Sequence, residues 1–175
     1  MTKKQISPSD YDSLNVEIIA ELHQTFVQNS WTLGLAESCT GGLVSSEITR
    51  RAGVSNFFQG SIVSYALSVK HEVFGIPWDI LNKDDGVSTE VALLMAQGSR
   101  MRLKCDWGLA ITGYAGPKGG SVDKPVGTVC IAVSGKGFEV VETNHFEGSR
   151  QQIQVAATHR ALTLLLETVR KGTRT

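Results

Sequence analysis

Two adjacent side chains with nucleophilic atoms, Ser38 and Cys39, lie in residues 36–42, which read Ala-Glu-Ser-Cys-Thr-Gly-Gly. An apolar run at 31–36 leads into them and a helix-forming stretch follows. The hydroxyl and the thiol are therefore expected where a strand ends and a helix begins. Free backbone N–H groups at a helix start can hold an anion or a developing oxyanion. Because α/β proteins commonly place a ligand or a nucleophile at such a turn, we expect one here.

A second candidate region is the loop at 113–120, which has four glycines in eight residues and cannot be a regular element. Its N–H groups, with Lys118 or Lys124, can form a nest for a phosphate group. The alternative interpretation is a surface loop whose glycines only permit tight turns. Arg150, at the start of the last predicted helix, is a further cation that can hold a phosphate.

The cysteines and histidines predict neither a disulfide framework nor a metal site. The cysteines are odd in number and widely spaced, and the histidines lack metal-ligand spacing. We therefore expect no bound metal. These residues are Cys39, Cys105, Cys130, His23, His71, His145 and His159.

The elements that position these residues follow from hydrophobic periodicity and from cap and stop signals. Leu14, Ile18 and Leu22 recur at helical intervals. Gly75 ends one predicted helix, and Ser88 is a good N-cap for the next. Helices are predicted over 11–29, 41–51, 67–74, 89–103 and 149–170, and strands over 31–36, 61–65, 107–112, 126–134 and 138–146.

The order of these elements predicts an α/β fold. Helices and strands alternate first, and then a hairpin and a last helix close the chain. This order is typical of a three-layer α/β/α sandwich with a mixed sheet that is parallel in its first part. We expect residues 1–9 to form a flexible tail and residues 10–172 to form a single domain.

Composition narrows the classes of function. The chain has 175 residues, 41% of them apolar, and its seventeen basic and seventeen acidic side chains cancel. A balanced charge argues against a large nucleic-acid footprint. No apolar run approaches the ~20 residues that span a bilayer, so we expect no membrane partner. The polar N-terminus lacks the apolar centre of a signal peptide, so a cytoplasmic location is expected.

Several blocks of residues, in order, resemble one known family. They are the segment at 36–42, Gly60, Tyr65, Lys70, Val87-Ser88, Thr112-Gly113, Ala115-Gly116-Pro117, Gly119-Gly120 and the segment at 124–129. This pattern is similar to the CinA C-terminal domain family, whose characterised members are nicotinamide-nucleotide amidases (PncC). The resemblance covers about 15–170. No part of the sequence resembles the N-terminal molybdopterin-binding-like domain of full-length CinA proteins, so a stand-alone form of the C-terminal domain is expected.

The resemblance implies an amidohydrolase that converts nicotinamide mononucleotide to nicotinate mononucleotide and ammonia. The family's nucleophilic serine falls on Ser38, and its tyrosine and lysine fall on Tyr65 and Lys70. No metal or organic cofactor is implied. The expected partner is a small pyridine nucleotide, and family members generally self-associate, which favours a homo-oligomer such as a dimer.

The implied mechanism requires an unusual base. A serine hydroxyl is a poor nucleophile until a base takes its proton, and Lys70 can do so only when burial or a nearby cation lowers its pKa. Tyr65 would relay or orient that proton, and N–H groups near Gly41 would stabilise the oxyanion. The substrate-binding residues expected from the matched blocks and the glycine loop, together with Arg150 at the start of the last helix, are Thr40, Gly41, Gly42, Ser88, Thr112, Gly113, Gly116, Gly119, Gly120, Lys124 and Arg150.

Simpler interpretations exist for several of these residues. Ser38 or Thr40 can be a helix cap, Tyr65 a core aromatic residue, and Lys70 a solvated lysine. Cys39 is a rival nucleophile, since thiolates form more readily than alkoxides. Against it, strand-like alternation would turn its side chain away from that of Ser38.

Four residues depart from the family's usual pattern. The family usually has a polar residue at the position of Leu67, glycine at Asp85, isoleucine at Tyr114 and an acidic residue at Ser149. Leucine cannot replace the hydrogen bonds of an amide, and a tyrosine ring can narrow a pocket. These departures leave open a second function, that of a catalytically weak or inactive paralogue that binds a nucleotide-like ligand.

Overall fold

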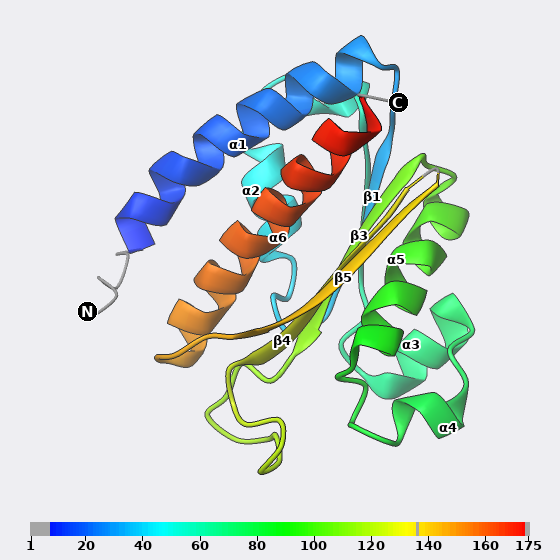
Figure 1. The fold of residues 1–175 in the computed structure, drawn as a ribbon, viewed down its shortest axis with the longest axis vertical. Coiled ribbons are helices and arrows are strands. Elements are labelled where there is room, and N and C mark those ends of the chain that lie inside the picture. Colours follow the sequence, from blue (N-terminus) through cyan, green and yellow to red (C-terminus); the bar gives the residue numbers. More distant parts are fainter. Residues whose placement is uncertain (1–7, 136, 174–175) are drawn as a thin grey trace.

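The computed structural model describes residues 8–135 and 137–173, in which five strands form one mixed sheet. The strand order is β2-β1-β3-β4-β5 (Figure 1). The first three strands are mutually parallel, whereas β4 runs antiparallel to both of its neighbours. The strands are β1 (Leu33–Glu37), β2 (Phe58–Val63), β3 (Trp107–Gly113), β4 (Thr128–Gly135) and β5 (Phe138–His145).

Helices cover both faces of this sheet, which confirms the predicted three-layer α/β/α sandwich with a partly parallel sheet (Figure 1). One layer contains α1 (Pro8–Gln28), α2 (Leu43–Thr49) and α6 (Arg150–Gly172). The other contains α3 (Leu67–Phe74), α4 (Trp78–Leu81) and α5 (Thr89–Leu103). A short 3₁₀ helix covers Val54–Asn56.

The central strands are buried along their length because both of their faces are covered. Every residue of β1 and β4 is buried, as expected for apolar runs between two helical layers. The core between the sheet and α1 and α6 includes Phe26, Trp107 and Leu165. On the other face, Met95 and Val91 of α5 pack on Ala110 of β3. Burial of the larger aliphatic and aromatic side chains, such as Phe26, Leu165 and Met95, contributes roughly 1.5–3 kcal/mol each.

Most predicted elements are present, with differences at their ends. Helix α2 begins at Leu43 and not at 41, because Gly41 (φ 62°) and Gly42 (φ 102°) have left-handed backbones. Strand β2 ends at Val63, so Tyr65 lies in the following loop and not in the strand. Helix α4 and the 3₁₀ helix were not predicted. The predicted tail at 1–9 lies mostly outside the described residues, and its last two residues belong to α1.

The start of α6 is defined by a capping box at Ser149. The Ser149 hydroxyl accepts from the Gln152 N–H, and the Gln152 side chain accepts from the Ser149 N–H. Such reciprocal bonds satisfy two donors that a helix start otherwise leaves unpaired. The departure from the family's acidic residue at this position therefore retains a helix-capping function, and it places Arg150 in the first turn.

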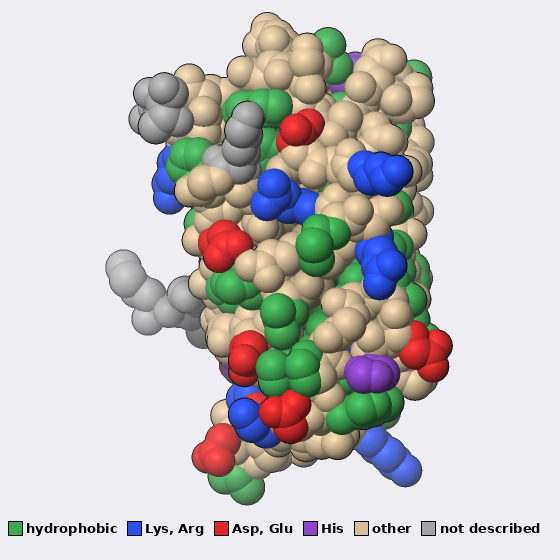
Figure 2. Space-filling model, turned by 90° about the vertical axis from the view of Figure 1, so that its right-hand side faces the viewer, with side chains coloured by type: hydrophobic (Ala, Val, Ile, Leu, Met, Phe, Trp, Pro, Cys, Tyr) green, Lys and Arg blue, Asp and Glu red, His purple; other side chains and the backbone are tan. Residues whose placement is uncertain are grey.

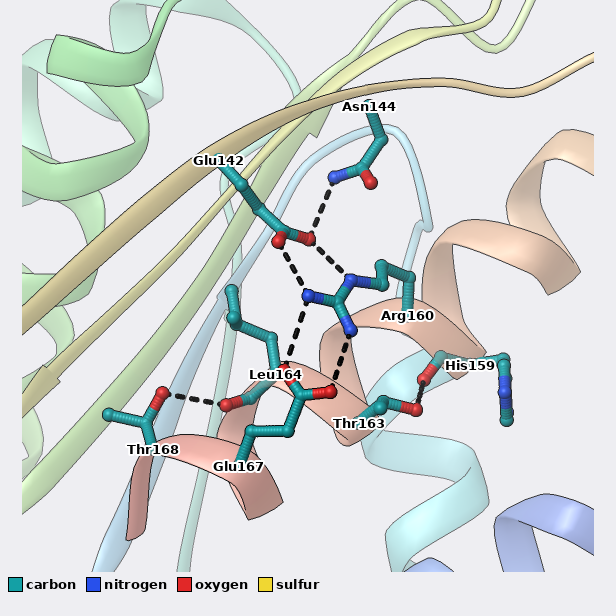
Figure 3. A network of polar contacts seen from close by, with 8 residues as sticks. All are labelled: Glu142, Asn144, His159, Arg160, Thr163, Leu164, Glu167 and Thr168. Atoms are coloured by element: carbon teal, nitrogen blue, oxygen red, sulfur yellow. Dashed lines mark hydrogen bonds and ion pairs between the residues drawn. The ribbon is translucent and has the colours of Figure 1, made fainter. Parts of the chain in front are cut away.

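Farther along α6, Arg160 links the helix to the edge strand β5 (Figure 3). Its Nε and Nη2 donate to the two carboxylate oxygens of Glu142 at 2.7 and 2.6 Å. Its Nη1 donates to Glu167 at 3.2 Å, and Asn144 donates to Glu142 at 2.9 Å. Bidentate pairs of this kind are strong because two charge-assisted bonds form together. They hold α6 on the sheet.

The face formed by α3, α4 and α5 carries basic, acidic and apolar side chains in a mixed arrangement (Figure 2). Neither basic nor acidic side chains predominate on this face. Within the described residues, none of the helices combines the length and the apolar character that crossing a membrane requires.

Candidate active site

Ser38 and Lys70 meet at the carboxyl end of β1. Lys70, on α3, donates from Nζ to Ser38 Oγ at 2.9 Å. The same amine donates to the carbonyl oxygens of Ser64 at 2.6 Å and Tyr65 at 3.5 Å. Ser38 is 8% and Lys70 only 2% exposed. The parallel strands end at one edge of the sheet, which brings the turn after β1 and the loop after β2 together.

Burial changes the acidity of this amine. Removal from water disfavours the ammonium form and lowers the pKa of Lys70 to about 8. A sizeable fraction of the side chain is then neutral near physiological pH. A neutral Nζ, 2.9 Å from Ser38 Oγ, can accept the hydroxyl proton.

The pair faces a cavity of about 150 Å³. An engineered cavity of about this size in another protein holds a benzene ring. The cavity is lined by Ser38, Cys39, Tyr65, Lys70, Asp85, Val87, Thr112, Gly113, Tyr114, Ala115 and Arg150. A larger hollow of about 800 Å³ runs along α1 beside His23 and Arg51 and shares no lining residue with the cavity at Ser38 and Lys70.

Tyr65 and Arg150 form a contact at the mouth of this cavity. Arg150 donates from Nη2 to the Tyr65 hydroxyl at 3.0 Å and from Nη1 to the Gly116 carbonyl at 2.7 Å. Tyr65 is 62% exposed. Within the described residues, its hydroxyl pairs with Arg150, whereas its backbone carbonyl contacts Lys70. This arrangement differs from the expected proton relay through the Tyr65 hydroxyl.

The sequence prediction missed Glu37, whose side chain is completely buried directly before Ser38. Its carboxylate accepts five hydrogen bonds of 2.8 to 3.1 Å. The donors are Thr40 Oγ1, Gly42 N, Val44 N, Ser45 N and Ser61 Oγ. The signal available in the sequence was a glutamate in the last position of an otherwise apolar strand, just ahead of a helix start.

The hydrogen bonds of Glu37 also correct the expectation that N–H groups near Gly41 are available to stabilise an oxyanion. The Gly42 N–H is bound to Glu37, and the Gly41 N–H donates to the Ser38 carbonyl at 3.0 Å. The Thr40 hydroxyl likewise donates to Glu37 at 2.8 Å, so Thr40 is not the N-cap of α2. These three residues line a separate hollow of about 400 Å³, beside Gln151 and Gln154. They hold the turn and do not face the cavity at Ser38.

The glycine loop joins the cavity only at its beginning. Thr112 and Gly113 line the cavity, and the Thr112 hydroxyl donates to the Gly86 carbonyl at 2.7 Å. Added Cβ atoms would lie 2.7 Å from the Thr128 carbonyl at Gly113 and 2.6 Å from the Lys124 carbonyl at Gly120. Gly116 and Gly119 have positive φ angles of 80° and 101°. Turn geometry and close packing therefore account for these glycines.

Lys124 fastens the glycine loop to the segment before α5. It forms an ion pair with Asp84 at 2.8 Å and donates to the Val87 carbonyl at 3.0 Å. The Tyr114 hydroxyl donates to the Asp84 carbonyl at 2.8 Å. Ser88 caps α5 by accepting from Val91 N at 3.1 Å. Lys124 and Ser88 thus already have structural partners in this arrangement.

Two of the four departures from the family pattern line the cavity. Asp85 and Tyr114 line it, and Asp85 is in the left-handed region with a φ of 47°. Leu67 packs with the apolar residues beneath α5, and an added Cβ on Gly86 would lie 2.6 Å from its Cδ2. An aromatic ring and a carboxylate therefore replace smaller groups in this chain.

Cys39 is a poor rival to Ser38. It is 5% exposed, and burial raises the pKa of its thiol to about 12. A thiol with this pKa is almost entirely protonated at neutral pH, and the thiolate is the nucleophilic form. Within 8–135 and 137–173, no three or more His, Cys, Asp or Glu side chains are grouped to hold a metal ion.

The fold and the site define a class of α/β protein in which a serine and a buried lysine meet beyond a parallel strand. The family model for the CinA C-terminal domain matches residues 15–169. The chain belongs to this family.

Curated relatives named "CinA-like protein" include one from Leptospira biflexa, 36% identical over 91% of this chain. Another, from Geotalea daltonii, is 42% identical over 80% of this chain. The aligned parts cover 38% and 34% of those proteins, so this chain spans less than two fifths of their length.

Solved structures of the superfamily match nearly the whole chain. A competence-damaged protein (CinA) superfamily protein from Escherichia coli has a TM-score of 0.84 and 31% identity, covering 93% of this chain and 94% of that one. The competence/damage-inducible protein CihA from Agrobacterium tumefaciens has a TM-score of 0.82 and 30% identity, covering 95% and 99%.

Proposed function

We propose that this chain is an amidohydrolase that deamidates nicotinamide mononucleotide to nicotinate mononucleotide and ammonia. The observation that carries the proposal is the 2.9 Å contact between Lys70 Nζ and Ser38 Oγ at the wall of the cavity. In this arrangement the Ser38 hydroxyl can act as the nucleophile, and the Lys70 amine, whose pKa is lowered by burial, can act as its base. The choice of nicotinamide mononucleotide as the substrate is based on the family resemblance.

In the proposed reaction, Ser38 Oγ attacks the carboxamide carbon while neutral Lys70 takes the hydroxyl proton. The resulting ammonium lies next to the tetrahedral intermediate and stabilises its negative charge. Lys70 then returns the proton to the leaving nitrogen, the carbon–nitrogen bond breaks, and ammonia departs. Water attacks the acyl-enzyme and its proton passes to Lys70. The bond to Ser38 Oγ then breaks, Lys70 returns that proton to Ser38 Oγ, and nicotinate mononucleotide leaves with both groups restored.

The cavity and its mouth suggest how the nucleotide would bind. A volume of about 150 Å³ suits the pyridine ring and its carboxamide but not the whole nucleotide. The ribose phosphate would then extend to the mouth, where Arg150 lies. A guanidinium forms paired hydrogen bonds with phosphate oxygens, and Arg150 would exchange its present contacts with Tyr65 and Gly116 for them.

Ammonia release from a panel of amide-bearing nucleotides tests this function. The panel contains nicotinamide mononucleotide, its riboside and free nicotinamide. We expect turnover of the mononucleotide by the wild-type chain and loss of turnover in both Ser38→Ala and Lys70→Ala. Near-normal turnover in either folded variant would remove that residue from the mechanism.

The second candidate function is a weakly active or inactive paralogue that binds a nucleotide-like ligand. Tyr114 favours it, because its ring lines the small cavity where the family usually has an aliphatic side chain. Thermal stabilisation by nicotinamide mononucleotide without ammonia release would support this binder. Rapid multiple-turnover release of ammonia that Ser38→Ala abolishes would exclude it.

A further inference from the structure

Glu37 is a charged side chain in the interior that the proposed chemistry does not use. Its exposed fraction is 0%, and its five hydrogen-bond donors are backbone N–H groups and hydroxyls. A carboxylate buried in this way is costly unless several donors surround it. Three of the donors are the N–H groups of Gly42, Val44 and Ser45, at the start of α2. The carboxylate therefore joins the last residue of β1 to the first turn of α2.

This connection determines the path of the turn that carries Ser38. The turn spans only 38–42, and the carboxylate binds two residues within it, through the Thr40 hydroxyl and the Gly42 N–H. The left-handed backbones of Gly41 and Gly42 let the chain fold back over Glu37. Ser38 is thus held between a buried strand and a turn that is itself tied to that strand.

The same residue also supports the base. The Glu37 carbonyl accepts from Ser64 N at 2.8 Å and from Ser64 Oγ at 3.4 Å. The Ser64 carbonyl in turn accepts from Lys70 Nζ at 2.6 Å. The Glu37 carboxylate also reaches β2, the strand just before Ser64, through the Ser61 hydroxyl at 3.1 Å. The Glu37 side chain therefore holds the turn that carries Ser38, and the Glu37 backbone holds Ser64, whose carbonyl binds Lys70.

We propose that Glu37 is a positioning residue that sets Ser38 relative to Lys70. The inference rests on the proposed function for its activity readout. A shift of about 1 Å in a reacting group can lower a rate by about 10²-fold. Loss of the carboxylate would loosen the turn and move Ser38 Oγ away from Nζ. Arg150, the residue proposed to hold the phosphate, hydrogen bonds with Gly116 and Tyr65, whereas the described hydrogen bonds of the Glu37 side chain go to other residues.

The first test is Glu37→Gln, which keeps the shape but turns an amide NH₂ toward groups that donate. We expect kcat to fall by about tenfold to 10²-fold, while KM changes by less than about twofold. Glu47→Gln is the matched control, because Glu47 lies on α2, the helix whose first turn binds Glu37, and its own carboxylate pairs with Arg50 and Asn15. We expect it to leave kcat unchanged. A purely structural role for Glu37 would lower the melting temperature and leave kcat intact in the folded protein.

A second readout does not depend on the substrate. Reaction of Ser38 with a small fluorophosphonate, followed by mass spectrometry well below the melting temperature, measures the reactivity of the nucleophile alone. We expect Glu37→Gln to slow labelling about as much as it lowers kcat. Labelling of the wild-type chain without ammonia release would overturn the substrate assignment and leave the Glu37 test intact. Failure of wild-type Ser38 to label would count against both proposals.

Two milder variants cover the case in which Glu37→Gln does not fold. Thr40→Val and Ser61→Ala each remove one hydroxyl donor and leave the carboxylate in place. Each should lower labelling and kcat by about threefold to tenfold, as expected for one lost hydrogen bond. Wild-type kcat and labelling in both of them, or in folded Glu37→Gln, would overturn the positioning role.

Discussion

Lys70 Nζ lies 2.9 Å from Ser38 Oγ, although 32 residues separate the two in the sequence. The contact is buried, and the amine has two carbonyl acceptors besides the serine. This geometry makes the protonation state of Lys70 the quantity on which the proposed chemistry depends.

The pH dependence of ammonia release should follow that state. Burial lowers the pKa of Lys70 to about 8, and only the neutral amine can accept the Ser38 proton. We therefore expect kcat/KM to rise with pH through about 8 and then to level off. Initial rates of ammonia release between pH 6 and 10 measure this profile. A rate that falls as pH rises toward 8 would contradict a basic role for Lys70.

Cys39 should be dispensable for activity. Because burial raises the pKa of its thiol to about 12, iodoacetamide should not inactivate the folded protein at pH 7 through Cys39. Cys39→Ala should retain kcat within about twofold and lose roughly 1 kcal/mol of unfolding free energy, owing to the small cavity left behind. Steady-state kinetics and urea unfolding check these two expectations. Loss of turnover in folded Cys39→Ala would make the thiol a nucleophile after all.

Arg150 and Tyr65 should affect substrate binding more than the chemical step. Arg150→Lys keeps a charge but removes the paired donors, so KM for the mononucleotide should rise about tenfold, or about 1.4 kcal/mol. KM for the riboside, which has no phosphate, should change little. Tyr65→Phe removes only the hydroxyl that contacts Arg150 and should keep most of kcat. A large drop in kcat for Tyr65→Phe would instead support a proton relay through that hydroxyl.

Tyr114 should limit the size of the ligand. Tyr114→Ile removes the ring from the cavity wall, and we expect kcat/KM for the mononucleotide to rise. The same change removes the hydrogen bond to the Asp84 carbonyl, at a cost of about 1 kcal/mol in stability. Tyr114→Phe separates the two effects, because it keeps the ring and loses the hydroxyl. Equal gains in kcat/KM from both variants would show that ring size is not the cause.

The pair between Glu142 and Arg160 should contribute to stability in a pH-dependent way. Burial opposes ionisation of Glu142, but hydrogen bonds from Arg160 and Asn144 outweigh it and lower the pKa of the carboxyl (Figure 3). The contribution is therefore fully present above the ordinary value near 4.5 and is lost as pH falls through the lowered pKa. Arg160→Met should lower the unfolding free energy by about 1–2 kcal/mol at pH 7. Urea unfolding at pH 7 and pH 3 should show this difference shrinking in acid.

The sequence by itself determined most of the elements and the place of Ser38 between a strand and a helix. Periodicity and caps act within a few residues, so the helices at 67–74 and 89–103 were predicted with the ends that the structure has. The predicted strand–turn–helix at Ser38 is also present, and the family's block pattern pointed to Lys70. Predictions were weaker where short-range signals compete, as at Gly41 and Gly42, whose left-handed backbones delay the helix.

Only the tertiary structure decided which partners these groups have. The five bonds to Glu37, the contact between Tyr65 and Arg150 and the ion pair between Lys124 and Asp84 join segments whose proximity depends on strand order and loop paths. The low pKa of Lys70 arises in the same way, because its burial requires the sheet, α3 and the turn at Ser38 to pack together. Hydrogen bonds and desolvation depend on distances in space, and residue types along the chain do not specify those distances.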